Sequence, residues 1–199
     1  MLRKAKVGFA GSIFLSLLVS PFLLDAAKMR ADCFQYAYST ALSILNHKKR
    51  AFDIAADSCR MEVGSSCLKY AYERLGASPQ LSTWGEAVNI CRKRVDDKCL
   101  LFAENFWQQT EKPRDKDRAF QMAAQSCHDE VYGDCLQYVY EHEKMIGRDN
   151  VTAFGAGVTV CRGGLLKPCL QTVYENISPD ARPDAWDHWG DAVSVCSRK

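Results

Sequence analysis

The sequence predicts an all-α fold: a right-handed solenoid of about five disulfide-stapled antiparallel helical hairpins, preceded by an N-terminal hydrophobic signal or anchor helix. Three observations predict this class. Ten cysteines recur with a period of 32 to 36 residues, the apolar residues beside them follow helical spacing, and turn-rich segments separate these helical stretches. A period of this length is typical of stacked helical hairpins, in which each unit contacts only its neighbours.

The cysteines divide the chain into five units. Four times, two cysteines lie eight positions apart, and gaps of 24 to 28 positions separate these pairs. The predicted repeat domain covers residues 28–199, with units at residues 33–59, 67–91, 99–127, 135–161 and 169–196. The cysteines that bound the units are Cys33, Cys59, Cys67, Cys91, Cys99, Cys127, Cys135, Cys161, Cys169 and Cys196. Because their number is even, we expect a disulfide framework.

Each unit carries two half-motifs with helical periodicity. The first follows the opening cysteine, as in Cys67-LKYAY, where Leu68, Ala71 and Tyr72 fall at i, i+3 and i+4. The second precedes the closing cysteine, as in WGEAVNI-Cys91, and combines a large aromatic with small residues that suit close helix packing. The segments between half-motifs are rich in Gly, Pro, Asn, Asp and charge, and span residues 46–50, 76–80, 110–116, 146–150 and 178–183.

A repeat of roughly 34 residues with this cysteine spacing resembles the disulfide-rich Sel1-like repeat proteins, relatives of the tetratricopeptide repeats. The resemblance covers residues 33–196, although the Leu-Gly and Gly-x-Gly signatures of Sel1 repeats are reduced here to Leu75-Gly76. It implies a scaffold or adaptor that binds other proteins. It also implies disulfides across the eight-position gaps.

Two disulfide pairings are compatible with antiparallel hairpins, which place all the cysteines at one edge of the array. In the hairpin pairing each unit closes on itself, from Cys33–Cys59 to Cys169–Cys196, and all ten cysteines are used. In the short-gap pairing Cys59 joins Cys67, and so on along the chain, which leaves Cys33 and Cys196 too far apart to pair. The constant gap favours the second and the even count the first, while chain entropy gives about 3 kcal/mol for either loop. We favour the hairpin pairing and keep the other as the alternative.

Residues 1–27 are predicted to be a signal peptide or a membrane anchor. Arg3, Lys4 and Lys6 precede an uncharged, mostly apolar run over residues 7–24. This run is long for a signal peptide and short for a membrane span. Cleavage and membrane anchoring through residues 7–24 therefore both stay open. With either, we expect a secreted or periplasmic protein, in the second case anchored by the uncleaved N-terminal helix.

Composition and motifs exclude several classes of function. Without residues 1–27, 23 basic and 23 acidic residues remain, so no global charge favours nucleic acid. No CxxC, phosphate loop, nucleophile elbow or paired-carboxylate motif is present, so we expect no catalytic residue, cofactor or metal. Zinc held by the cysteine row is the rival to disulfides. Four isolated histidines are expected to be exposed or to cap helices: His47, His128, His142 and His188.

These observations favour a non-catalytic scaffold that binds a protein or peptide partner. The candidate binding residues are tyrosines of the first half-motifs, which also suit core packing: Tyr36, Tyr38, Tyr70, Tyr138 and Tyr174. The alternative is a membrane-anchored subunit or assembly factor of the periplasm or the mitochondrial intermembrane space, and a secreted helical hydrolase is a third hypothesis. Asn150 and Asn176 lie in glycosylation sequons, which are used only in a eukaryotic secretory pathway.

Overall fold

The computed structural model describes residues 31–60, 62–76, 79–92, 94–110, 115–177 and 186–197. The predicted signal or anchor, residues 1–27, lies outside these ranges. Among the helices that the structure describes, none has the length and apolar character needed to cross a membrane.

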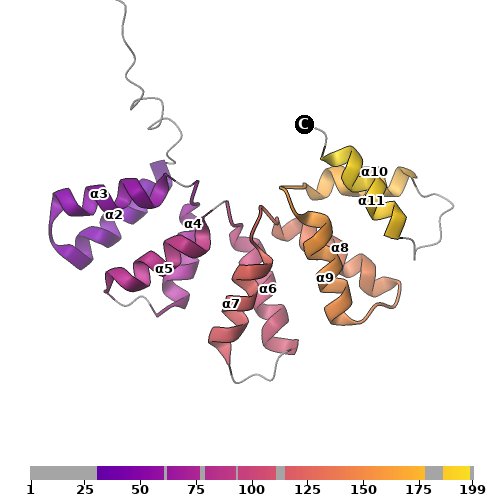
Figure 1. The fold of residues 1–199 in the computed structure, drawn as a ribbon, viewed down its shortest axis with the longest axis horizontal. Coiled ribbons are helices and arrows are strands. Elements are labelled where there is room, and N and C mark those ends of the chain that lie inside the picture. Colours follow the sequence, from indigo (N-terminus) through magenta and orange to yellow (C-terminus); the bar gives the residue numbers. More distant parts are fainter. Residues whose placement is uncertain are drawn as a thin grey trace, which may run out of the picture.

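The described residues form ten helices and no strands, which confirms the all-helical class (Figure 1). In chain order the helices are α2 (Ala31–Leu45), α3 (Lys48–Cys59), α4 (Ser65–Arg74), α5 (Leu81–Cys91), α6 (Asp97–Thr110), α7 (Lys116–Ser126), α8 (Gly133–Met145), α9 (Asn150–Cys161), α10 (Lys167–Ile177) and α11 (Trp186–Cys196). Aspartates cap two of the B helices defined below: Asp115 accepts the amide of Arg118 at 2.9 Å, and Asp149 accepts the amides of Val151 and Thr152 at 3.0 Å.

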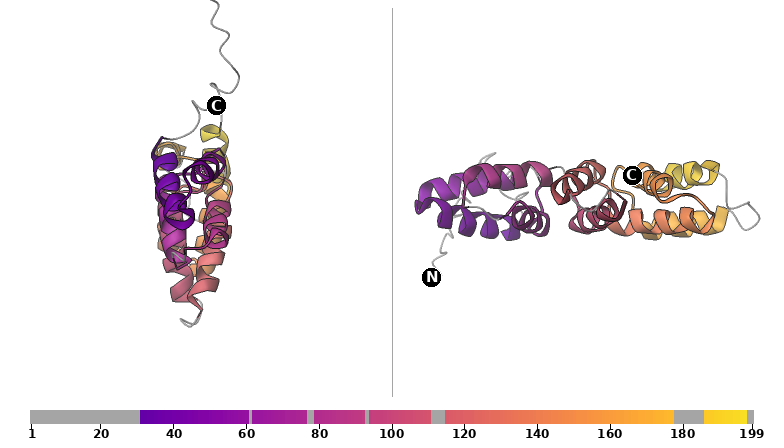
Figure 2. Two further views of the ribbon diagram at one scale, coloured as in Figure 1. Left: turned by 90° about the vertical axis from the view of Figure 1, so that its left-hand side faces the viewer. Right: turned by 90° about the horizontal axis from the view of Figure 1, so that it is seen from below.

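Each even-numbered helix packs against the helix that follows it, so that the chain forms five hairpins. We call the first helix of each hairpin helix A and the second helix B. Successive A helices also contact one another, from α2 with α4 to α8 with α10. The hairpins spread like a fan (Figure 1), and the helices lie in two layers (Figure 2). The short linkers between hairpins gather at the concave inner edge of the fan.

The structure contains the hairpin pairing of the cysteines. The disulfides are Cys33–Cys59, Cys67–Cys91, Cys99–Cys127, Cys135–Cys161 and Cys169–Cys196, and no cysteine is free. The short-gap pairing, which the family resemblance implied, is therefore not the one found. The reason is geometric: the start of each A helix lies beside the end of its own B helix, with Cα atoms 5.8 to 5.9 Å apart, within the range a disulfide spans.

Hairpins interlock through one aromatic side chain of helix B, placed seven residues before the closing cysteine. In the fourth hairpin this residue is Phe154, which stacks on Phe106 of the preceding A helix with ring centroids 4.1 Å apart. In the fifth it is Trp189, which packs against Tyr138 and His142 of the preceding A helix. Trp84 and Phe120 contact the preceding A helix in the same way, at Tyr36 and Tyr70. The large aromatic of the second half-motif is therefore, in the second to fifth hairpins, the contact with the preceding hairpin.

Gly133 lies at a close approach between the backbones of the third and fourth hairpins. A Cβ atom on this residue would lie 2.6 Å from the backbone of Lys98 and Cys99. The amide of Gly133 donates to Oδ2 of Asp96 at 2.7 Å, so the contact is also a hydrogen bond. Only glycine permits this approach without moving one hairpin.

We expect Gly133→Ala to lower the free energy of unfolding by about 2 kcal/mol, because the added methyl group must displace backbone rather than a flexible side chain. The matched control is Gly155→Ala in the middle of α9, where a Cβ meets no atom within 4 Å. This control should raise the free energy of unfolding by about 0.5 to 1 kcal/mol. Urea unfolding followed by far-UV circular dichroism measures both. Equal effects of the two variants would contradict the close approach.

Candidate peptide-binding groove

The four eight-position linkers share one local design. Each has a buried aliphatic residue four positions after the closing cysteine: Val63, Val95, Val131 and Leu165. The residue just before it has a positive φ in every linker: Glu62, Arg94, Glu130 and Gly164. This left-handed backbone conformation places one side chain of the linker in the core, while the side chains on either side of it point outward. The described residues of the linkers therefore present side chains at the inner edge of the fan.

Three of these outward side chains form a charged row along the linkers. Arg94 donates to both carboxylate oxygens of Glu62, through Nε and through Nη2 at 2.7 Å, while its Nη1 lies 3.5 Å from Oε1 of Glu130. The hydrogen bond to Glu62 raises the pKa of Arg94. The carbonyl of Glu130 accepts the amide of Gly164 at 2.9 Å, which continues the contact to the next linker. Side chains from consecutive linkers thus align along one edge.

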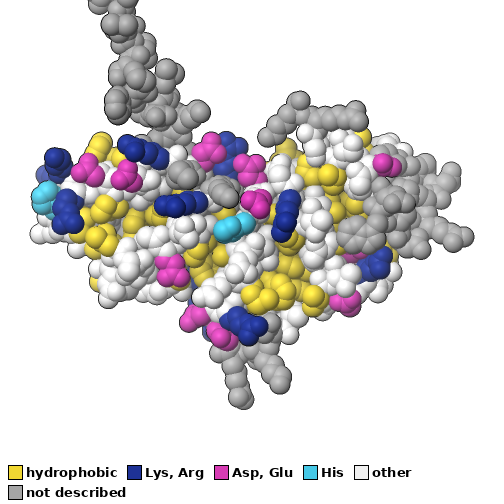
Figure 3. Space-filling model, viewed as in Figure 1, with side chains coloured by type: hydrophobic (Ala, Val, Ile, Leu, Met, Phe, Trp, Pro, Cys, Tyr) yellow, Lys and Arg dark blue, Asp and Glu magenta, His cyan; other side chains and the backbone are white. Residues whose placement is uncertain are grey.

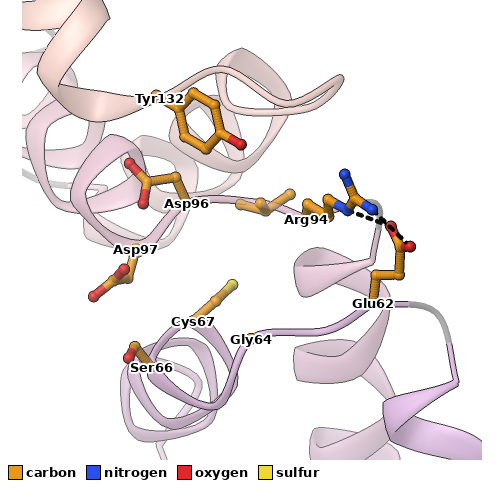
Figure 4. A pocket seen from close by; sticks show the side chains of 9 residues that line it. Glu62, Gly64, Ser66, Cys67, Arg94, Asp96, Asp97 and Tyr132 are labelled. Atoms are coloured by element: carbon orange, nitrogen blue, oxygen red, sulfur yellow. Dashed lines mark hydrogen bonds and ion pairs between the residues drawn. The ribbon is translucent and has the colours of Figure 1, made fainter. Parts of the chain in front are cut away.

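Two adjoining hollows of about 330 and 340 Å³ lie along this edge and form what we call the linker groove. Asp96 and Tyr132 line both hollows. In Figure 4 the Tyr132 ring lies near Asp96, while Gly64, Ser66 and Cys67 form the opposite wall of the first hollow. The first hollow is completed by Glu62, Arg94, Val95 and Asp97, and the second by Lys98, Asp134, Leu166, Lys167 and Pro168. The linker groove is therefore shared by at least three consecutive linkers.

The side chains of the linker groove are held by contacts between hairpins. Oδ2 of Asp96 accepts the amides of Cys99 at 3.2 Å and Gly133 at 2.7 Å, so it caps α6 and ties it to α8. Lys98 pairs with Asp134 at 2.9 Å, and this hydrogen bond raises the pKa of the lysine. The first hollow has three carboxylates, those of Glu62, Asp96 and Asp97, against one arginine. The first hollow therefore favours a positively charged ligand group.

The predicted tyrosines lie mostly between hairpins rather than in the linker groove. Tyr36 packs against Trp84, Tyr138 against Trp189, and the Tyr70 hydroxyl donates to Glu104 at 2.7 Å. Tyr174 is only 8% exposed and stacks on Trp189, and Tyr38 stacks on Phe34 in the first hairpin. Their packing role is observed, and their role in binding stays a prediction. Burial raises the pKa of Tyr36, Tyr70, Tyr138 and Tyr174, which is consistent with packing.

Tyr132 is the aromatic side chain of the groove that sequence reasoning missed. It belongs to a linker, whereas the helical half-motifs drew attention to the tyrosines of the A helices. The sequence does contain a signal for Tyr132: all four linkers have the same length, and each has an aliphatic residue near its centre. A connection of fixed length with a buried anchor is ordered, so its other side chains are candidates for binding.

Two of the histidines agree with their predicted roles and one does not. His47 caps α3, since its Nδ1 accepts the amide of Arg50 at 3.3 Å, and His128 is exposed. His142 was expected to be exposed or capping, but it packs edge-on against Tyr174 and Trp189. Burial there lowers its pKa. The prediction was wrong because the interlocking tryptophan of the next hairpin covers this face of α8.

Two buried carboxylates link neighbouring hairpins away from the linker groove. Glu104, 3% exposed, accepts hydrogen bonds from Tyr70 and Arg74 of the second hairpin and from Gln108 of its own helix. Glu143 of the fourth hairpin accepts the indole N–H of Trp189 at 2.8 Å. In both cases a hydrogen bond accompanies the aromatic contact between the two hairpins. The hydrogen bond makes the pairing of these two hairpin faces specific.

The chain matches no protein-family model, no curated protein and no solved structure. In the described part of the chain, no group of three or more His, Cys, Asp or Glu side chains is placed to hold a metal ion. The five disulfides suggest an oxidising environment of the extracellular type.

Proposed function

We propose that this protein is an exported, non-enzymatic repeat scaffold that binds an extended segment of a partner protein in the linker groove. The observation that carries the proposal is the groove itself, built from the linkers of consecutive hairpins whose ends are tied by disulfides. In this proposal the hairpins form a right-handed solenoid like that of Sel1-like repeats. Solenoids commonly bind partners on their concave surfaces.

The groove suits an extended peptide with a basic side chain. An extended chain can run across successive linkers, whereas a compact small molecule would occupy one hollow. The carboxylates of Asp96 and Asp97 would pair with the basic side chain, and the Tyr132 ring would pack against the adjoining residue. Because the linkers are held by buried anchors and disulfides, the protein itself loses little conformational entropy when the peptide binds.

We place this scaffold outside the cell or in the periplasm, where disulfides persist. Residues 1–27 would direct export, and residues 7–24 would anchor the chain if they are not removed. In the anchored form the protein would act as a subunit or assembly factor of a larger complex and present the same groove. The first residue of the purified protein distinguishes the two forms.

A peptide array tests the proposed function. The oxidised protein is applied to immobilised peptides of about ten residues with random flanks and Arg, Leu or Glu at the centre. We expect selective binding of the Arg series. Tyr132→Ala should weaken that binding about tenfold, since an aromatic contact at the centre of an interface carries much of the affinity.

The charge of the groove is tested by Asp97→Asn. Its matched control is Asp117→Asn, because both aspartates stand in the first turn of a helix, α6 and α7, but only Asp97 lines the groove. We expect weaker binding of the Arg series by the first variant alone. Equal binding of all three series, or full affinity in Tyr132→Ala, would contradict the proposal.

A further inference from the structure

The face that each hairpin turns toward its predecessor is built from four repeated positions. They lie one and five residues after the opening cysteine, and seven and three residues before the closing one. In the second hairpin they are the buried residues Leu68, Tyr72, Trp84 and Val88. In the first hairpin they are Phe34, Tyr38, Phe52 and Ala56, which we call the end face.

The end face is apolar but not covered by another hairpin in the described part of the chain. Phe52 is 55% exposed, whereas the equivalent Trp84 is 2% exposed. Phe34 packs edge-on against Phe52 and stacks on Tyr38, so the aromatic side chains are already arranged as a surface. Figure 3 shows apolar side chains on the first hairpin, at the left, among basic and acidic ones. Within the described part of the chain, the end face is therefore an interlocking surface that no other hairpin covers.

The opposite end of the array is different. In the A helices of the second to fourth hairpins, the positions three and seven residues after the cysteine meet the next hairpin, as Phe102 and Phe106 meet Phe154. In the last hairpin these positions are Thr172 and Asn176, both exposed and polar. A polar outer face is what a terminal repeat needs for solubility. Among the described hairpins, the last therefore presents a polar outer face and the first presents the apolar end face.

We propose that the end face binds an amphipathic helix of another protein, in the place that a preceding A helix would occupy. The internal contacts define the required chemistry. Phe154 lies against Phe102 and Phe106, and Trp189 against Tyr138 and His142, so the aromatic is received by two large side chains four residues apart. The partner helix therefore carries two large apolar residues at i and i+4, which project from one side of a helix.

Charge specifies the partner further. Lys48, Lys49 and Arg50 are exposed at the start of α3, next to the end face, and form no ion pair with any described residue. In the internal contact between the second and third hairpins, Arg74, near the end of an A helix, reaches the start of the next B helix, where it donates to the Lys116 carbonyl at 3.2 Å. The partner helix should accordingly carry acidic residues near its C-terminal end.

A second copy of this chain fits the end face less well. Head-to-tail stacking would bring the polar Thr172 and Asn176 against Phe52. Head-to-head stacking would bring two basic segments, residues 48–50 of each copy, close together. An acidic helix from a different protein avoids both costs.

A labelled peptide tests the proposal without knowledge of the natural partner. Its sequence is that of residues 97–110 with Cys99→Ala, because this helix already receives Phe154 in the structure. One version carries Gln109→Glu and Thr110→Glu, and the other carries Gln109→Lys and Thr110→Lys. Fluorescence anisotropy measures binding to the oxidised protein. We expect the acidic peptide to bind about fivefold or more tightly than the basic one at low salt.

Protein variants assign the binding to the end face. Phe52→Ser should weaken it about tenfold, and Leu101→Ser, at an apolar residue 51% exposed on α6, should leave it unchanged. Replacing Lys48, Lys49 and Arg50 by alanine should abolish the preference for the acidic peptide. Tyr132→Ala should have no effect here, which separates this proposal from the linker groove. Unchanged affinity in Phe52→Ser, or no binding of either peptide, would overturn the proposal, as would a dimer in sedimentation velocity that Phe52→Ser dissociates.

Discussion

Replacing Cys99 and Cys127 together by alanine is expected to lower the free energy of unfolding by about 3 to 4 kcal/mol, from the entropy of the loop that the disulfide closes. This bond joins residues 28 positions apart in the central hairpin, which has neighbours on both sides. Its loss should also split urea unfolding into two transitions. Each unit of a repeat array contacts only its neighbours, so an unstable central hairpin uncouples the hairpins on its two sides. The unfolding transitions measured by circular dichroism and by tryptophan fluorescence then no longer coincide.

The matched control is the Cys169→Ala and Cys196→Ala variant at the last hairpin. Its loop is nearly the same length, 27 positions, but among the described hairpins this one contacts a single neighbour. We expect a similar loss of stability in that hairpin without division of the rest of the array. A central variant that unfolds in a single transition at the wild-type urea concentration would contradict the role given to the disulfide.

The pairing itself can be measured on the unreduced protein. Trypsin should release residues 51–60, which contain Cys59, joined to residues 31–48, which contain Cys33. The short-gap pairing would instead join residues 51–60 to residues 61–69, which contain Cys67. Mass spectrometry distinguishes these products directly.

Glu104→Ala is expected to destabilise the protein by about 3 kcal/mol, since it removes one partner of a buried, hydrogen-bonded charge pair. Glu104 receives donors from Tyr70, Arg74 and Gln108, and all three would lose their acceptor at once. Arg74 is itself only 25% exposed, so water replaces the lost carboxylate poorly. Urea unfolding measures the effect.

Two further variants identify the cause. Glu104→Gln keeps an acceptor for hydrogen bonds but removes the charge, and we expect an intermediate loss of about 1 to 2 kcal/mol. Asp134→Ala breaks the pair with Lys98, in which both side chains are more than 60% exposed, and should cost less than about 1 kcal/mol. If Glu104→Ala costs no more than Asp134→Ala, the buried carboxylate does not hold the second and third hairpins together.

Much of the fold could be predicted because the same pattern of residues occurs in each repeated unit. Leu68 and its equivalents Leu100, Leu136 and Leu170 recur one residue after a cysteine, and all four are fully buried. Phe52 shows the limit of that reasoning. It has the same place in its repeat as Trp84, yet it is exposed, because burial depends on whether another hairpin precedes it. A local sequence pattern shows which face of a helix is apolar, but not whether another hairpin packs against that face.

The candidate site was less accessible to sequence reasoning. The tyrosines of the A helices stood out by their recurrence, but the structure places Tyr70 and Tyr174 between hairpins, against Glu104 and His142. Tyr132 occurs once and lies in a linker, so no periodicity pointed to it. Contacts such as Arg94 with Glu62 and Glu130 join residues 32 and 36 positions away. They arise only when consecutive linkers come side by side.

By itself, the sequence determined the helical class, the five repeated units and the presence of a disulfide framework, because each rests on spacing that recurs along the chain. Only the tertiary structure decided which cysteines pair, which aromatic residues are buried, and that the linkers line a groove. The physical reason is the same in each case. Helix periodicity is a local property, whereas pairing and burial depend on the distance between backbones that the packing of whole hairpins sets.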